Sequence, residues 1–226
     1  MLPGSVKAAP MPPQQMAPHT STPIPPVGPA SARQEGAPDS DLYRQVAKVA
    51  ATGNTAFNAG NYASAMRNYL IIDGTDSSIA TDASQFDFTA DTPTSSASLA
   101  RQRVYEEIRD LIIAQRNIGL MYERGWGEAQ SYVMAAGWYD RALSHGLADA
   151  QAEGHLGVLL GNGLGILKNT DRAAQLLEHS HNDNLLVLLK HNRLPPTFDG
   201  GADPATAQLA ASLRTQDAVE ENARSK

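Results

Sequence analysis

Cysteine is absent from this sequence of 226 residues, which excludes disulfide bonds, thiolate metal ligands and cysteine nucleophiles. Basic residues are also few, since 18 Lys and Arg face 24 Asp and Glu and no basic cluster is present. Binding to nucleic acid or to anionic lipid requires such a cluster, so no nucleic-acid partner is expected. Long apolar runs are missing too, because none approaches the roughly 18 residues of a membrane span. We therefore expect no membrane insertion.

The N-terminal residues lack the basic flank and the apolar centre of a signal peptide. The sequence as it stands therefore predicts a soluble, cytoplasmic protein. A Pro-rich segment ahead of a folded domain is, however, what often remains after a signal peptide has been removed, and such processing would place the protein in the periplasm. The compartment stays open, because cytosolic and exported chains alike can lack cysteine.

Proline is concentrated at one end of the chain, with ten of the 14 prolines in residues 1–40. Few side chains in this stretch are charged or large and apolar, so it cannot build a core. Residues 1–40 are therefore predicted to form a disordered, partly polyproline-II tail, which we interpret as a spacer. The alternative is a ligand for an aromatic-lined groove, for which Pro23–Pro26 is the best candidate.

Residues 73–98 form a second break in composition, with five Asp, no Lys or Arg, and an abundance of Ser, Thr and Ala. A stretch of this length without secondary structure is uncommon inside a compact domain. We therefore predict a solvated linker between two helical units. The alternative is a loop that docks through Phe86 and Phe88, either on a partner or in this protein's own binding groove.

Helical periodicity dominates the remainder, and no β-alternation of useful length is present. Residues 41–72 predict a helical hairpin, and residues 99–124 carry an apolar stripe. The stripe consists of Val104, Ile108, Leu111, Ile112, Ile118 and Met121. Further helices are predicted at 131–145, 150–162, 171–181 and 184–192. A last helix is predicted from Asp203-Pro204, where an N-cap residue precedes a first-turn proline, to about Glu221.

These patterns divide the chain into five parts. The predicted parts are the tail 1–40, a hairpin at 41–72, the linker 73–98, a repeat region at 99–194, and a C-terminal loop and capping helix at 195–226.

The repeat region aligns with itself at an offset of 38 residues. Six small residues are identical at this offset: Ala114 with Ala152, Gly119 with Gly157, Gly125 with Gly163, Gly127 with Gly165, Ala135 with Ala173 and Ala136 with Ala174. Gly119 and Gly157 fall within helices, where Gly costs about 1 kcal/mol relative to Ala. We therefore expect each of them to permit the close approach of a neighbouring helix. Gly125 and Gly163 follow helices and fit the left-handed position after a helix end.

The first repeated unit reads Ile118-Gly119-x-x-Tyr122-x-x-Gly125-x-Gly127, then Ala135-x-x-Trp138-Tyr139-x-x-Ala142 and Gly146. In this order and spacing of small, aromatic and turn positions it resembles a Sel1-like repeat. Residues 156–174 resemble the same repeat more weakly, and Leu176-Leu177 follows where the Trp-Tyr pair stood.

The upstream hairpin resembles the related tetratricopeptide repeat, through Gly53, Phe57, Gly60, Tyr62, Ala65 and Tyr69. It departs from that family at Val49 and Thr52, where larger apolar residues are usual. Together these resemblances imply an all-α fold, a short right-handed α-solenoid of helical hairpins. Residues 184–192 would then supply a third first helix, covered by the C-terminal helix.

The resemblance also implies a noncatalytic scaffold or adaptor that binds a protein partner, commonly in bacterial envelope, secretion or signalling systems. In such repeats the first helix of each hairpin lines a concave groove. Carrying that pattern over gives the outward-facing candidates for partner binding: Asn54, Asn58, Arg116, Glu123, Arg124, Gln151 and Asn162. The alternative is a structural subunit of a larger bacterial envelope or secretion assembly.

The sequence offers no recognisable catalytic or metal-binding constellation, so we expect no enzyme activity, metal or cofactor. Five of the six histidines fall between His145 and His191, but His179 and His181 would point away from each other on a helix. The histidines are therefore interpreted as surface or partly buried residues. Glu106 and Glu107, like Asp140 and His145, are assigned to solvated helix faces.

Two further motifs are explained by packing. Residues 161–165 are Gly-rich, but they follow a helix and lack the Lys-Ser/Thr ending of a phosphate loop, so we interpret them as a joint between helices. Trp138 and Tyr139 match core positions of the repeat rather than a ligand-stacking pair.

Overall fold

The computed structural model describes residues 40–76, 79, 95–199 and 203–225. The chain divides into two units, residues 1–36 and residues 37–226, and the description that follows concerns the second. Residues 1–39 of the predicted tail and residues 80–94 of the predicted linker lie outside the described residues. Within the described ranges the regular structure consists of helices without strands, which confirms the all-α fold class.

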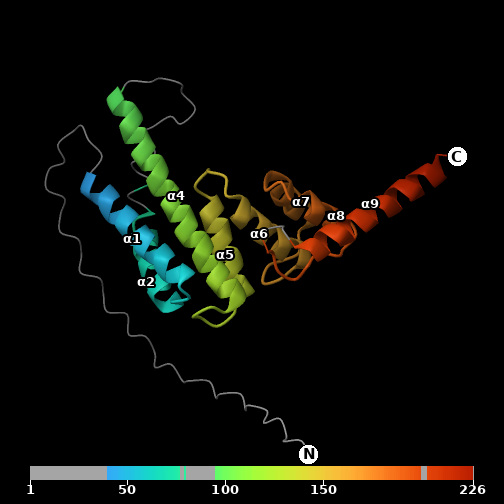
Figure 1. Cartoon of the computed structure of the whole chain (residues 1–226), viewed down its shortest axis with the longest axis horizontal. Helices are drawn as coiled ribbons and strands as arrows, with labels where there is room; N and C mark the ends of the chain where they lie inside the picture. Colours follow the sequence, from blue (N-terminus) through green and yellow to red (C-terminus); the bar gives the residue numbers. More distant parts are fainter. Residues whose placement is uncertain (1–39, 77–78, 80–94, 200–202, 226) are drawn as a thin grey trace, which may run out of the picture. The chain divides into compact units, whose positions relative to one another are not determined.

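Eight helices have defined bounds (Figure 1). They are α1 (Ser40–Asn58), α2 (Tyr62–Asp73), α4 (Ser95–Arg124), α5 (Tyr132–Leu143), α6 (Ala150–Asn162), α7 (Thr170–His179), α8 (Asp183–Lys190) and α9 (Pro204–Arg224). The bounds lie close to those expected from the sequence, except that α4 begins four residues earlier than 99 and α9 extends three residues beyond Glu221. None of the helices in the described ranges is long and apolar enough to cross a bilayer.

The helices pair into hairpins that stack in chain order, as Figure 1 shows. The hairpins are α1 with α2, α4 with α5, and α6 with α7, and they meet through contacts of α2 with α4 and of α5 with α6. Helix α8 packs against α7 on one side and α9 on the other. This arrangement is the α-solenoid of helical hairpins, with α8 as the third first helix of the repeat region, after α4 and α6, covered by α9.

The apolar stripe on α4 forms the centre of the core. All six of its members are buried, and Leu111, Ile118 and Met121 are fully covered. Tyr139 of α5 is fully buried as well, while Trp138 packs against the core from a partly buried position. The core assignment is therefore confirmed for Tyr139, whereas Trp138 lies at the edge of the core.

Each hairpin is closed by a glycine on its first helix that faces a large side chain on its second. A Cβ atom added to the glycine would lie within 3.0 Å of that side chain in every case: Gly53 against Tyr69, Gly119 against Tyr139 and Gly157 against Leu177. The close approach predicted for Gly119 and Gly157 is confirmed. Gly53 makes the same contact in the upstream hairpin, so all three hairpins close in one way.

Successive hairpins also stack through one recurring contact, made by the loop that follows each first helix. A Cβ added to Gly127 would lie 2.8 Å from Tyr62 Cβ, at the start of α2. One added to Gly165 would lie 2.7 Å from Tyr132 Cβ, at the start of α5. The upstream hairpin therefore stacks on the second as the second stacks on the third, although residues 74–94 separate them in the sequence.

Candidate protein-binding surface

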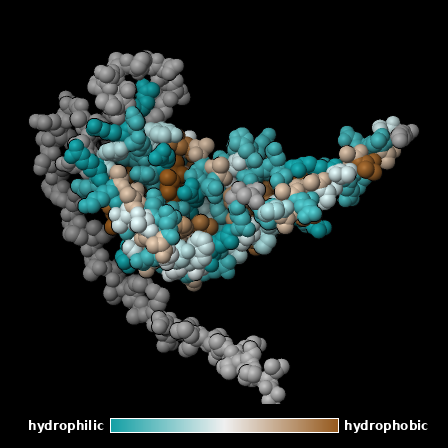
Figure 2. All heavy atoms as spheres, in the orientation of Figure 1, coloured by the Kyte–Doolittle hydropathy of each residue, from teal (hydrophilic) through white to brown (hydrophobic). Residues whose placement is uncertain are grey.

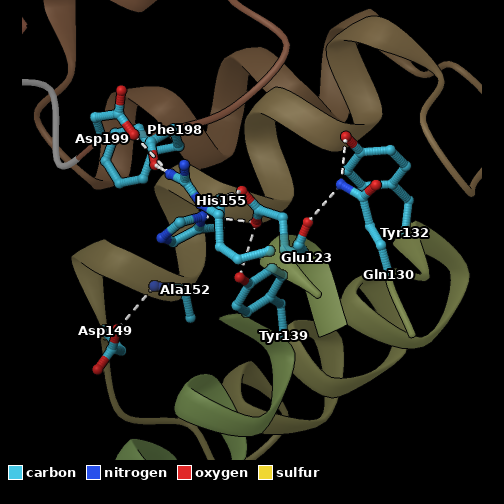
Figure 3. A network of polar contacts seen from close by, with 10 residues as sticks. Glu123, Gln130, Tyr132, Tyr139, Asp149, Ala152, His155, Phe198 and Asp199 are labelled. Carbon is cyan, nitrogen blue, oxygen red and sulfur yellow. Dashed lines mark hydrogen bonds and ion pairs between the residues drawn. The ribbon is translucent and has the colours of Figure 1, made fainter. Parts of the chain in front are cut away.

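Three buried polar residues join the second and third hairpins (Figure 3). Oε2 of Glu123, at the end of α4, accepts a hydrogen bond from the Tyr139 hydroxyl of α5 at 2.8 Å. The same oxygen lies 2.8 Å from Nδ1 of His155 on α6. The rings of Tyr139 and His155 stack with their centroids 5.0 Å apart. Glu123, Tyr139 and His155 are called the buried triad below.

Electrostatics keeps the triad hydrogen-bonded. Burial raises the pKa of the Tyr139 hydroxyl far above its usual value of 10.0, and the neighbouring Glu123 carboxylate raises it further. The phenol therefore stays protonated and donates to Glu123. Because a carboxylate can only accept, His155 donates its Nδ1 proton. The triad is thus a structural connection between α4, α5 and α6.

A segment of the chain without regular secondary structure covers the triad. Residues 194–199, Leu-Pro-Pro-Thr-Phe-Asp, are called the C-terminal segment below. The buried ring of Phe198 stands edge-on to His155, with the centroids 4.8 Å apart. It lies directly over Gly154 of α6, where an added Cβ would fall 2.6 Å from Phe198 Cε1. Leu194 covers Gly161 in the same way, since a Cβ there would overlap Leu194 Cδ1.

Polar side chains of the first helices hold the C-terminal segment at both ends. Arg124, the last residue of α4, donates to the Phe198 carbonyl at 2.8 Å and to the Asp199 carboxylate at 2.6 Å (Figure 3). Asn162, the last residue of α6, donates to the Pro195 carbonyl at 2.8 Å. The surface formed by Arg124, Gly154, His155, Gly161 and Asn162 is called the segment groove below.

The seven residues predicted from the repeat pattern differ in their surroundings. Arg124 and Asn162 bind the C-terminal segment, and Arg116 forms an ion pair with Asp149 at 2.8 Å. Asn54 accepts a hydrogen bond from Tyr69 at 2.8 Å, while Asn58 and Gln151 are exposed. For Glu123 the expected outward orientation is wrong. Its side chain is 1% exposed, because it turns inward to Tyr139 and His155.

Three other sequence interpretations need correction. His155 is buried rather than at the surface or partly buried, because it packs against Tyr139 and Phe198. Glu107 is buried rather than solvated. Gly161 lies within α6 beneath Leu194, whereas Gly163 and Gly165 do form the joint, with φ angles of 71° and 68°.

The described part of the acidic 73–98 segment contacts α4 and α5. Asp73 and Asp76 form ion pairs with Arg141 of α5, at 3.0 and 2.9 Å. Asp73 also accepts a hydrogen bond from Gln115 at 2.9 Å. The alternative to a solvated linker, docking through Phe86 and Phe88, concerns residues that lie outside the described part of the chain. The groove position over α6 is taken by the C-terminal segment.

The signal that sequence reasoning missed is a pair of glycines outside the repeat pattern. Gly154 and Gly161 have no glycine counterpart at the offset of 38, where Arg116 and Glu123 stand. Helix-interior glycines that the repeat does not require would have indicated a close contact on α6. Nothing in the sequence indicated that Phe198 would make it.

In the described residues, seven large apolar side chains are exposed. They come from five elements: Leu70, Ile71, Tyr105, Val133, Met134, Leu167 and Val219. On the face that Figure 2 shows, hydrophilic side chains predominate among the coloured residues, and the hydrophobic ones are scattered. This face therefore has no broad apolar surface for a partner. The apolar contact surface in the segment groove is narrow.

Comparison with known proteins identifies the repeats. The family model described as "Sel1 repeat" matches residues 112–147 and 150–178, which lie within the second and third hairpins. No curated protein matches the chain. Among solved structures, the chain is similar to the crystal structure of a Sel1 repeat protein from Oxalobacter formigenes, with 24% identity and a TM-score of 0.34. The match covers 65% of this chain and 64% of that one, so less than two thirds of that protein is represented.

Proposed function

We propose that this chain, a Sel1-like repeat protein through residues 112–178, is a noncatalytic scaffold that binds a protein partner on the first helices of its hairpins. Sel1 repeats generally mediate protein–protein interaction and typically have no enzymatic role. A place in a bacterial envelope, secretion or signalling system is part of the proposal. So is membership in a multi-subunit complex.

One observation carries the proposal. The segment groove holds a piece of chain that has no regular secondary structure, through Arg124 and Asn162 at the ends of two successive first helices. Both residues are among those that the repeat pattern selects for partner binding. A surface that binds an irregular segment of its own chain has the geometry to bind one from another protein.

The buried triad supports a noncatalytic role. Glu123 and His155 could resemble an acid–base pair, but each is at least 96% covered. The His155 ring is stacked on Tyr139 and makes a T-shaped contact with Phe198. Oε2 of Glu123 binds both the Tyr139 hydroxyl and Nδ1 of His155, which connects α4, α5 and α6, so we assign the pair a structural function.

Site-specific photo-crosslinking in the native organism tests the proposal. A photoreactive amino acid is placed at Gln151 or Asn58, which are exposed on first helices, or at the control positions Gln175 and Val133, which are exposed on second helices. We expect the first pair to form a defined adduct with one protein and the second pair to form none.

The same experiment separates the two candidate roles. A structural subunit of a larger assembly would be contacted on several faces, so adducts from both pairs at fixed stoichiometry would favour that alternative. Adducts from the second helices alone would contradict binding on the first helices.

A further inference from the structure

The C-terminal segment is held by the kinds of contact that proteins use for extended peptides. One aromatic ring fills a pocket, two backbone carbonyls accept hydrogen bonds from Asn162 and Arg124, and the Asp199 carboxylate pairs with Arg124. Side-chain pockets combined with main-chain hydrogen bonds are the usual basis of peptide recognition. The Phe198 ring is the anchor, since it is 3% exposed.

The groove under the segment is built into α6 at a cost. Gly154 and Gly161 stand seven residues apart, which places them on one helix face two turns from each other. Each destabilises a helix by about 1 kcal/mol relative to Ala. Their counterparts on α4 are Arg116 and Glu123, so the repeat fold does not require glycine there. Gly154 leaves the space that the Phe198 ring fills, and Gly161 leaves the space that Leu194 fills together with Leu189 of α8.

We infer that the segment groove is the binding site for an extended partner segment with the chemistry of residues 194–199. Such a segment carries an aliphatic residue followed by prolines, then an aromatic residue and an acidic one. The C-terminal segment is the resident occupant, which the partner displaces. This inference rests on the proposed function and names the partner's chemistry.

A partner segment has to compete with the resident segment for the groove. Because the resident segment is tethered to α8 by only residues 191–193, its effective concentration at the groove is on the order of millimolar or higher. A free segment of equal intrinsic affinity therefore binds the intact protein much more weakly than it binds a variant whose own segment has been released. This difference is the measurable signature of displacement.

The experiment uses a fluorescent peptide of residues 192–201 and the full chain, with binding followed by fluorescence anisotropy. Phe198→Ala removes the anchor of the resident segment and leaves Gly154 free. We expect the peptide to bind this variant at least about tenfold more tightly than it binds the wild type. The same peptide with Ala in place of Phe should lose binding by about tenfold or more.

A second substitution locates the binding. Gly154→Ala in the Phe198→Ala background fills the ring pocket, so peptide binding should be lost. If Phe198→Ala fails to fold by circular dichroism, Asp199→Arg replaces it, because the largely exposed Asp199 contributes little to the core and Arg at this position would repel Arg124. The peptide should then bind the Asp199→Arg variant more tightly than it binds the wild type.

Several outcomes would overturn the inference. A folded Phe198→Ala chain that does not bind the peptide, or binding that survives Gly154→Ala, would show that the groove has no such specificity. A dimer formed by exchange of C-terminal segments, with no binding of free peptide, would show that the occupant is a second copy of this chain. Whichever of these results is obtained, crosslinked adducts at Gln151 would still support the proposed function. A failure of the groove inference can therefore be distinguished from a failure of the proposed function.

Discussion

Gly119 of α4 lies beneath the ring of Tyr139 of α5, and a Cβ atom at Gly119 would stand 2.7 Å from the ring carbon Cε1. A side chain at position 119 would therefore have to displace the Tyr139 ring. That ring is fully buried and is held by its hydrogen bond to Glu123. Gly157 faces Leu177 in the next hairpin at 3.0 Å, against a more adaptable side chain. The hairpins therefore depend on these glycines to different degrees.

Gly119→Ala is expected to destabilise the protein by about 1–3 kcal/mol, the usual cost of overpacking. Gly157→Ala should cost less, because the tip of Leu177 can shift. Gly137→Ala is the matched control, since Gly137 lies in the exposed interior of α5 with open space around it, and it should stabilise by up to about 1 kcal/mol. Chemical denaturation measures all three. Equal effects at Gly119 and Gly137 would refute close packing at Gly119.

Tyr139→Phe removes the hydroxyl that donates to the buried Glu123 carboxylate. Hydrogen bonds to charged groups contribute about 1.5–3 kcal/mol, whereas neutral ones contribute about 0.5–1.5 kcal/mol. Tyr69→Phe is the comparison, because the Tyr69 hydroxyl bonds to the neutral amides of Asn54 and Asn117 at 2.8 and 2.9 Å. We expect Tyr139→Phe to lower the free energy of unfolding more than Tyr69→Phe does. The reverse order would mean that the triad adds no special stability.

Glu153 should make stability depend on pH. Burial raises the pKa of its carboxyl, and one of its oxygens is buried without a hydrogen-bond partner. Because the folded state holds the proton more tightly than the unfolded state, stability is greatest below the unfolded pKa of about 4.5 and declines as pH rises through the folded value. Glu153→Gln should therefore raise the Tm at pH 7, and the gain should shrink towards pH 4.

The control for this prediction is Glu178→Gln on α7, whose side chain is exposed. It should leave the Tm unchanged across the same pH range. A pH-independent gain in Glu153→Gln would show that the gain does not come from the titration of Glu153.

Gly154→Ala is expected to release the C-terminal segment, because the new methyl group occupies the position of the Phe198 ring. Trypsin should then cleave after the exposed Arg193 faster than it does in the wild type. Gly137→Ala serves again as the control and should leave that rate unchanged. Unchanged cleavage in Gly154→Ala would mean that the ring is not held over this glycine.

The fold was predictable because its determinants are local and periodic. The stripe on α4 fixed which face is buried, and the repeated glycines at 119 and 157 indicated where helices meet. The site was less predictable, since its partners are distant in the sequence. Arg124 and Asn162 follow from their repeat positions, but their contacts lie in residues 195–199, where no periodic pattern exists.

Glu123 shows the limit most clearly. Its repeat position suggested an outward side chain, and a charged residue is rarely buried without partners. Tyr139 and His155 supply those partners from two other helices, and only the packed structure brings the three together. Periodicity predicts that a residue lies on a helix, but it does not predict which polar groups of other helices will bind that residue.

The most direct test of partner binding at the segment groove is a ¹⁹F NMR measurement on the full chain with a fluorinated phenylalanine at Phe198. The ring lies between His155 and Gly154, so the free protein should show one resonance at a shift typical of a buried ring. Phe57, which packs against Tyr62 and Trp126, provides an internal reference when it is labelled in the same way. When the protein identified by crosslinking at Gln151 is added to saturation, we expect the Phe198 signal to move to the solvent-exposed position and the Phe57 signal to stay. A Phe198 resonance that does not change at saturation would contradict binding at this groove.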